Sequence, residues 1–192
     1  IVGLGANTRL RHVPGLRACE GVDIVAVCNR RPESTAAAAH EFGIPRTYAG
    51  AAELLANEKL DAVDVAVPRE HHAAVCALAA KRGLPILCQK PLAPTLAEAQ
   101  ALVRNVGKRS RLMVHENWRF RTHYLLMKKW LEEGRVGRVR QAIMTILTSG
   151  FIPDAQGKMY AVDRQPFFAT EKRLLLMEVL IHHVDCLRFL LG

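Results

Sequence analysis

The amino-acid sequence predicts a doubly wound α/β fold, with a parallel sheet in the first part of the chain and the beginning of an α+β domain after it. From Ile1 to about Glu116, short β-branched apolar runs alternate with Ala- and Leu-rich stretches of helical length. This alternation is typical of βαβ units that build a parallel sheet. The runs are apolar at nearly every position, which indicates strands that are covered by helices on both faces.

The predicted elements follow one another in βαβ order. The chain starts with what we interpret as the end of a buried strand, and Gly43 and Gly83 end two of the helices in the left-handed conformation. The predicted strands cover residues 1–5, 22–28, 62–67, 85–88 and 112–115, and the predicted helices cover residues 8–19, 32–42, 70–82, 94–106 and 121–133.

The last third of the chain has a different pattern. Residues 139–148 form a long β-type run, residues 150–170 are irregular, and residues 174–191 are apolar and of helical length. One strand and one helix do not make a stable layer, so we expect the rest of this sheet, open and mostly antiparallel, to lie beyond Gly192. We also expect the natural N-terminus to precede Ile1. The predicted domains are 1–120 and an incomplete 121–192.

Composition narrows the classes of function. Half of the 192 residues are hydrophobic and 23% are charged, which is typical of a globular protein. No run reaches the roughly 18 apolar residues of a membrane span, so we expect no membrane role. Lys and Arg are spread along the chain despite a net charge of +9, so we expect no nucleic-acid partner. Five scattered cysteines predict neither disulfides nor a metal site and fit the cytoplasm, while a secretory signal upstream stays open.

A glycine-rich turn follows the first predicted strand. Gly3 and Gly5 permit a tight turn and a close approach of a pyrophosphate to backbone N–H groups at the start of a helix, beside Asn7 and Thr8. Thr8 stands where the third glycine of the GxGxxG pattern is expected. The context predicts a dinucleotide-binding Rossmann turn, and an ordinary βα turn is the alternative.

The end of the second predicted strand bears on the choice of dinucleotide. Asn29 and Arg30 stand where an acidic residue would bind the adenosine ribose of NAD. An arginine there can bind a 2′-phosphate, so we expect NADP rather than NAD. Solvated surface arginines are the alternative interpretation.

Four further motifs, taken in order along the chain, resemble those of the Gfo/Idh/MocA oxidoreductase family. Gln89-Lys90-Pro91 is similar to the family's Glu-Lys-Pro motif, and Pro68 with His72 is similar to its strand-end Pro and following His. The other two motifs are the segment His115-Glu116-Asn117-Trp118-Arg119-Phe120 and the pattern Glu178-x-x-x-His182-x-x-Asp185. The chain departs from the family at Thr8, Gln89 and Glu178.

The resemblance implies an NAD(P)-dependent oxidoreductase that acts on a sugar, polyol or related hydroxy compound. His182 would remove or return the hydroxyl proton, and Lys90 would hydrogen-bond the same oxygen while hydride moves to or from nicotinamide. The implied catalytic residues are Lys90, His182 and Glu178; the implied cofactor-binding residues are Gly3, Gly5, Asn7, Thr8, Asn29, Arg30, Pro68, His72, Gln89 and Lys90; and the implied substrate-binding residues are Lys90, Asn117, Trp118, Glu178 and His182.

Helix periodicity supports one part of this assignment. Residues four apart share a helix face, so Glu178 and His182 are expected to project together, with Asp185 on the same side. A carboxylate can orient an imidazole for proton transfer. The alternatives are a solvated Lys90 and a His182 that is satisfied within the core.

Two other functions stay open from the sequence. One is an NAD-dependent glycoside hydrolase of the same family, which would not accumulate free reduced cofactor, and the other is a ligand-sensing regulator that keeps the fold without the chemistry. For the full-length protein we expect a homo-oligomer, either a dimer or a tetramer.

Overall fold

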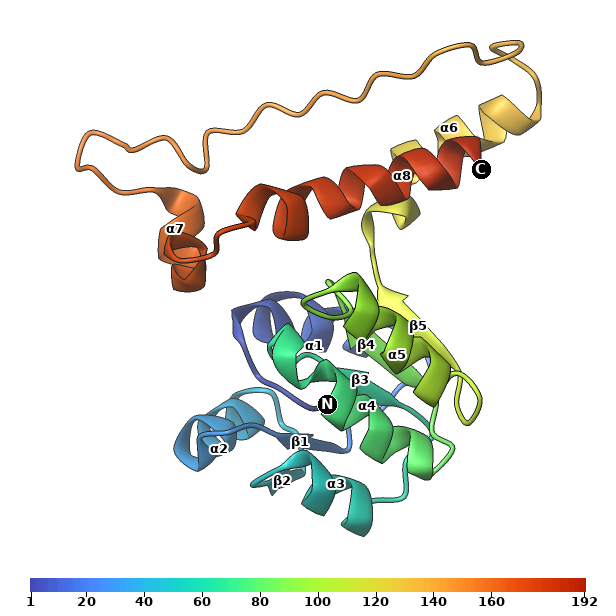
Figure 1. Cartoon of the computed structure of the whole chain (residues 1–192). Coiled ribbons are helices and arrows are strands. Elements are labelled where there is room, and N and C mark those ends of the chain that lie inside the picture. The colour runs from blue at the N-terminus through green and yellow to red at the C-terminus, as the bar shows by residue number, and fades with distance from the viewer. The chain divides into compact units, whose positions relative to one another are not determined.

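A computed structural model describes all residues from Ile1 to Gly192. The chain divides into two compact units, Ile1–His115 and Glu116–Gly192, which are described separately. Figure 1 shows the elements of both units, coloured along the chain. None of the helices combines the length and apolarity that a membrane crossing requires.

The first unit is built on a parallel sheet whose centre is formed by the start of the chain. Val2 makes parallel bridges to Cys28 on one side and Val65 on the other, which places it between two groups of paired strands. The resulting order is β2-β1-Val2-β3-β4-β5, so the direction of winding reverses at Val2. The strands are β1 (Ala26–Cys28), β2 (Arg46–Tyr48), β3 (Val63–Val65), β4 (Ile86–Gln89) and β5 (Leu112–His115).

Helices cover both faces of this sheet, as continuous apolarity in the strands predicts. The helix after Val2 begins as a π-helical stretch, η1 (Thr8–His12), and continues as α1 (Val13–Arg17). The others are α2 (Pro32–Glu41), α3 (Ala51–Asn57), α4 (His72–Lys81), preceded by the 3₁₀ turn η2 (Arg69–His71), and α5 (Leu96–Val106). Helices α3, α4 and α5 pack side by side (Figure 1).

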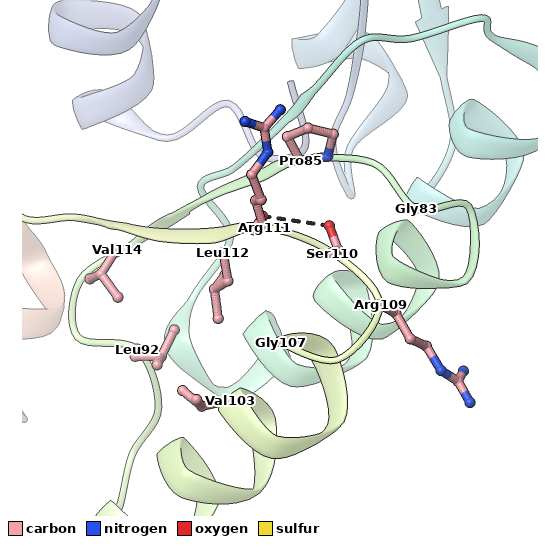
Figure 2. Close-up of a pocket in the computed structure, with 10 residues that line it drawn as sticks. All are labelled: Gly83, Pro85, Leu92, Val103, Gly107, Arg109, Ser110, Arg111, Leu112 and Val114. Atoms are coloured by element: carbon pink, nitrogen blue, oxygen red, sulfur yellow. Dashed lines mark hydrogen bonds between the residues drawn. The ribbon is translucent and has the colours of Figure 1, made fainter.

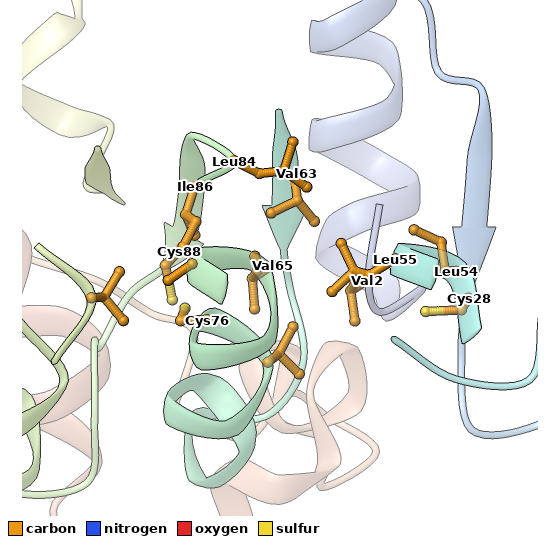
Figure 3. Packing of buried hydrophobic residues seen from close by; sticks show 14 of the residues in the cluster. Val2, Cys28, Leu54, Leu55, Val63, Val65, Cys76, Leu84, Ile86 and Cys88 are labelled. Atoms are coloured by element: carbon orange, nitrogen blue, oxygen red, sulfur yellow. The ribbon is translucent and has the colours of Figure 1, made fainter. Parts of the chain in front are cut away.

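Alternate residues of β1 enter two separate cores. Ala26 and Cys28 belong to the larger core under α3, α4 and α5, part of which Figure 3 shows, whereas Val27 packs with Leu4 and Ile44 in the smaller one. Successive side chains of a strand point to opposite faces, so this division shows that both faces are covered. The prediction of a doubly wound parallel sheet is therefore confirmed.

The structure differs from the predicted elements of this unit in two places. The run 22–28 forms a strand only over β1, and β2 and α3 were not predicted from the sequence. Arg46 and Thr47 in β2 are exposed, so this edge strand lacks the apolar run by which the other strands were identified.

The second unit contains helices and a long extended segment. Its helical elements are η3 (Trp118–Phe120), α6 (Thr122–Glu132), α7 (Tyr160–Arg164), η4 (Pro166–Ala169), the π-helical η5 (Leu175–Leu180) and α8 (Ile181–Leu191). Helices α6 and α8 enclose a small core around Tyr124, Cys186 and Leu190. The prediction of a strand at 139–148 is wrong for this structure: the segment has no β pairing, because it has no neighbouring strand, and Leu147 is 94% exposed.

We expect the substitution Gly3→Ala to destabilise the first unit. Gly3 has φ +102°, and a Cβ there would lie 2.5 Å from the carbonyl oxygen of Ala66. Strain of this kind costs about 1–3 kcal/mol, before the clash is counted. Urea unfolding should show a loss of at least that size, whereas Gly5→Ala, whose Cβ would meet no atom within 4 Å, should unfold close to wild type. Equal effects of the two substitutions would contradict this explanation.

A second prediction concerns Glu58, which is buried and binds two side chains of β2. Arg46 Nη2 donates to Glu58 Oε2 at 2.8 Å, and the Tyr48 hydroxyl donates to Oε1 at 2.6 Å. The hydrogen bond from Arg46 and, to a smaller extent, the hydrogen bond from Tyr48 lower the pKa of Glu58 to about 2. The pKa of Glu58 in the folded protein lies below the unfolded value of about 4.3. The ionised Glu58 therefore stabilises the fold fully above the unfolded pKa, and this stabilisation is lost as the pH falls toward 2.

Glu58→Gln should therefore reduce the free energy of unfolding at pH 7, and the difference from wild type should shrink as the pH falls from 5 to 2. Chemical denaturation at several pH values measures both quantities. The exposed Glu20 provides the control substitution Glu20→Gln, for which we expect no comparable pH dependence. A Glu58→Gln deficit that is independent of pH would argue against the ion pair.

Candidate active site

The predicted residues of the first unit lie at one edge of its sheet. Because all strands are parallel, their carboxyl ends meet at the same edge, and the reversal of winding at Val2 opens a crevice there in folds of this type. The residues at this edge include Gly3, Gly5, Asn7 and Thr8 after the bridges of Val2, Asn29 and Arg30 after β1, Pro68 after β3, and Gln89 and Lys90 at the end of β4.

The turn of residues 3–8 has the shape that a pyrophosphate requires. Gly3 packs directly against the backbone of Ala66, and Gly5 is exposed with open space where a Cβ would lie. The N–H of Arg9 donates to the carbonyl of Gly5 at 3.1 Å, so the N–H groups between these residues belong to the first helical turn. Thr8 is 1% exposed, so its side chain lies inside the protein and not on the open side of the turn. The turn therefore fits the phosphates of a dinucleotide.

After β1 the chain presents cations. Asn29 is half-buried, and Arg30 and Arg31 are exposed ahead of α2. No acidic side chain stands at positions 28–31, where a ribose-binding carboxylate would be expected. The guanidinium of Arg30 is thus accessible to an anionic group at the same edge of the sheet.

His72 is buried, not exposed toward a ligand. Its Nε2 lies 2.9 Å from the carbonyl oxygen of Val67 and its Nδ1 lies 3.2 Å from that of Leu92. Burial lowers the pKa of His72 below its usual value, which favours the neutral ring. The ring thus connects the end of β3 to the segment after Lys90, and its contact with a cofactor stays a prediction, as does that of the exposed Pro68.

Gln89 and Lys90 are held by a network that includes the buried residues His12 and Asp64 and that was not predicted from the sequence. Gln89 Oε1 accepts from the backbone N–H of Lys90 at 2.7 Å, and Gln89 Nε2 lies 2.9 Å from Nε2 of His12, whose Nδ1 lies 2.7 Å from Asp64 Oδ2. Asp64 is the polar interruption in the predicted strand 62–67. A carboxylate in a strand that is covered on both faces needs a partner, so Asp64 was the residue from which a buried network could have been predicted.

In the second unit His182 is oriented by a carboxylate from the segment after β5. Its Nδ1 lies 2.7 and 2.8 Å from the two carboxylate oxygens of Glu116, which is itself buried. Trp118 stacks on the imidazole with parallel planes and a centroid separation of 4.7 Å, and its backbone N–H donates to Glu116 at 3.2 Å. An ionised Glu116 only accepts, so Nδ1 carries the proton, and Nε2 of the neutral ring is left as the acceptor.

The carboxylate found on His182 is thus Glu116 and not the predicted Glu178. Glu178 lies in η5, half-buried one turn before His182, and its role stays a prediction. Asn117 is exposed at the start of η3, and the guanidinium of Arg119 makes two hydrogen bonds to Asp185, which connects η3 to α8. Glu116 could have been identified from the sequence as a charged residue that directly follows the end of a predicted strand.

A cavity of about 800 Å³ lies elsewhere in the first unit (Figure 2). Pro85 and Arg111, which line it, directly precede β4 and β5, so it extends from the amino ends of these strands. It contains none of the predicted site residues. Its lining residues are Gly83, Pro85, Leu92, Val103, Gly107, Arg109, Ser110, Arg111, Leu112 and Val114.

Comparison with known proteins identifies relatives of both units. D-apiose dehydrogenase of Paraburkholderia graminis is 33% identical over the whole of this chain, which spans 49% of that relative. Inositol 2-dehydrogenase of Salmonella agona is 26% identical, again over the whole chain and 54% of the relative. The chain thus spans about half the length of these relatives.

Solved structures and a family model agree with this result. The crystal structure of an oxidoreductase from Agrobacterium radiobacter in complex with NAD⁺, L-tartaric acid and magnesium superposes with a TM-score of 0.84 and 32% identity, over all of this chain and 53% of that one. Residues 1–117 match the GFO_IDH_MocA model, described as an oxidoreductase family with an NAD-binding Rossmann fold. The chain therefore belongs to the Gfo/Idh/MocA family of oxidoreductases, as its motifs predict.

Proposed function

We propose that the full-length protein is an NAD(P)-dependent dehydrogenase that interconverts a hydroxyl and a carbonyl group on a sugar or polyol. The observation that carries this proposal is the imidazole of His182, held at Nδ1 by the buried carboxylate of Glu116. The names of the relatives, an apiose and an inositol dehydrogenase, support the substrate class. They do not favour the hydrolase or sensor alternatives.

His182 acts as the general base for alcohol oxidation. With its Nδ1–H donated to Glu116, the lone pair on Nε2 can accept the hydroxyl proton, and the Glu116 carboxylate stabilises the imidazolium that forms. Stacking by Trp118 restricts rotation of the ring. Glu178 and Asn117, from the same unit, are proposed to bind other polar groups of the substrate.

Lys90 binds the reacting oxygen through its ammonium group. A cation that donates a hydrogen bond to this oxygen stabilises the negative charge that develops as the proton leaves. A bound nicotinamide supplies the hydride acceptor in this chemistry. The turn of residues 3–8 holds the pyrophosphate of the dinucleotide, and Gln89 lies at the cofactor side of Lys90.

NADP is proposed as the preferred dinucleotide. Arg30 is exposed at the end of β1, and its guanidinium can bind a 2′-phosphate in two parallel hydrogen bonds. No carboxylate at positions 28–31 offers the alternative contact to a 2′-hydroxyl.

A cytoplasmic homo-oligomer, dimeric or tetrameric, is proposed for the full-length protein. All five cysteines are free thiols, which suits a reducing compartment. Ile143 and Leu147 of the extended segment are 80% and 94% exposed. Large apolar side chains that are this exposed on an extended segment are usually covered by a further strand or subunit. Sedimentation of the full-length protein measures the assembly.

His182→Gln in the full-length protein should lower kcat by a factor of about 10²–10⁴, the usual contribution of a general base. Glu116→Gln keeps an acceptor for Nδ1–H but loses the charge, so we expect a smaller decrease. Steady-state oxidation of a panel of sugars and polyols measures both. The exposed His71 provides the control His71→Gln, and a wild-type kcat in His182→Gln would reject His182 as the base.

Arg30→Ala should weaken NADPH binding and leave NADH binding nearly unchanged. A hydrogen bond to a charged group contributes about 1.5–3 kcal/mol, which corresponds to at least a tenfold change in Kd. Nicotinamide fluorescence titration of the full-length protein measures both constants. Arg104→Ala, an exposed arginine on α5, controls for the loss of charge. Tighter binding of NADH than of NADPH by the wild type would overturn the NADP preference.

A further inference from the structure

Side chains from three segments, namely β3, residues 7–12 and the end of β4, meet inside the first unit. Asp64 Oδ2, in the middle of β3, lies 2.7 Å from Nδ1 of His12. Nε2 of His12 lies 2.9 Å from Nε2 of Gln89 and 3.2 Å from Nδ2 of Asn7. Gln89 Oε1 accepts from the backbone N–H of Lys90 at 2.7 Å. His12 is 3% and Asp64 8% exposed, so a buried chain of contacts runs from β3 to Lys90.

Each contact in this chain requires a particular proton arrangement. The carboxylate of Asp64 only accepts, so Nδ1 of His12 is the donor, and Nε2 of the neutral ring is an acceptor. Two amide N–H₂ groups, from Gln89 and Asn7, face that acceptor. The amide of Gln89 then has its oxygen toward the N–H of Lys90. If the Gln89 amide were rotated, its oxygen would face the acceptor Nε2 of His12 and its N–H₂ group would face the N–H of Lys90.

We propose that Asp64 and His12 are positioning residues for Lys90: the Asp64 carboxylate selects the His12 tautomer, the tautomer orients the Gln89 amide, and the amide holds the backbone of Lys90. This inference rests on the proposed function of Lys90 as the group that binds the reacting oxygen. Through Asn7 the same imidazole contacts the dinucleotide turn. His12 thus connects the cofactor turn to Lys90.

The surroundings of His12 contain few other charges. The ring of His115, at the end of β5, meets it edge-on with a centroid distance of 4.3 Å and an interplanar angle of 80°. The Asp64 carboxylate also interacts electrostatically with the Cys88 thiol. Asp64 is the carboxylate that bonds the ring, and it therefore decides which ring nitrogen carries the proton.

The decisive variant is Gln89→Glu in the full-length protein. The side chains at positions 64 and 89 are then both carboxylates that only accept, so His12 can bond both of them only with a proton on each nitrogen. A His12 ring with a proton only on Nδ1 instead places the lone pair of Nε2 against the carboxylate introduced at position 89, and the support of Lys90 is then lost. We expect kcat/KM to fall at least about tenfold relative to wild type at pH 8.5, and much less at pH 6.

Adding Asp64→Asn to Gln89→Glu should reverse most of this loss. The amide introduced at position 64 can donate to Nδ1, so a neutral His12 donates from Nε2 to the carboxylate at position 89, whose other oxygen still accepts from Lys90. We expect the double variant to recover at least about fivefold over Gln89→Glu at pH 8.5, although Asp64→Asn alone lowers activity. Gln100→Glu, exposed on α5, adds the same charge elsewhere and serves as the control. Additive effects, or a Gln89→Glu profile parallel to wild type, would overturn the proposal.

A second measurement does not depend on turnover. Nitrogen-15 spectra of histidine-labelled full-length protein, with the His12 signal assigned from its absence in His12→Gln, report the protonated ring nitrogen directly. We expect the Nδ1–H tautomer in wild type and a doubly protonated ring in Gln89→Glu at pH 6. The Nε2–H tautomer in wild type would refute the network. If these spectra agree and no substrate is turned over, the proposed function fails and the network stands.

Discussion

The architecture of the first unit depends on the backbone hydrogen bonds of Val2 and Gly3. The N–H of Val2 donates to the backbone carbonyl of Asp64 at 2.8 Å, and the carbonyl of Val2 accepts from the N–H of Ala66 at 2.8 Å. The N–H of Gly3 donates to the backbone carbonyl of Cys28 at 2.9 Å. These bonds unite β1 and β3 in one sheet. They also place the following turn at the strand-order reversal, with Gly3 against the backbone of Ala66. The position of the turn of residues 3–8 follows from these bonds.

Two carboxylate–imidazole pairs in this chain have different surroundings. Asp64 binds Nδ1 of His12 and Glu116 binds Nδ1 of His182, so both histidines have Nε2 as the remaining acceptor. In His12 that acceptor is already occupied by amide groups, and the ring is buried. In His182 we propose that it accepts a substrate proton. A carboxylate and an imidazole thus form an enclosed contact at His12, and at His182 we propose that they are suited to catalysis, because the second ring nitrogen has different surroundings.

Local pattern was sufficient for most of the fold. The strands β3, β4 and β5, and the helices of the first unit other than α3, were predicted within a few residues, because apolar runs and helix-ending glycines can be recognised from the local sequence. The edge strand β2 was missed, since Arg46 and Thr47 are exposed and carry no apolar run. The run 139–148 was wrongly assigned as a strand, since pairing depends on a neighbour and not on the run itself.

The sequence by itself determined the family, the parallel sheet implied by its βαβ units, and the likeness of the motifs around Lys90 and His182. Helix periodicity also predicted that Glu178 projects on the same side as His182, and this stays a prediction. Only the tertiary structure decided that Glu116 is the carboxylate on His182, and that Asp64 and His12 support Gln89. These partners are separated by 52 to 77 positions in the chain, and hydrogen bonds between distant segments arise from packing, which no local spacing encodes.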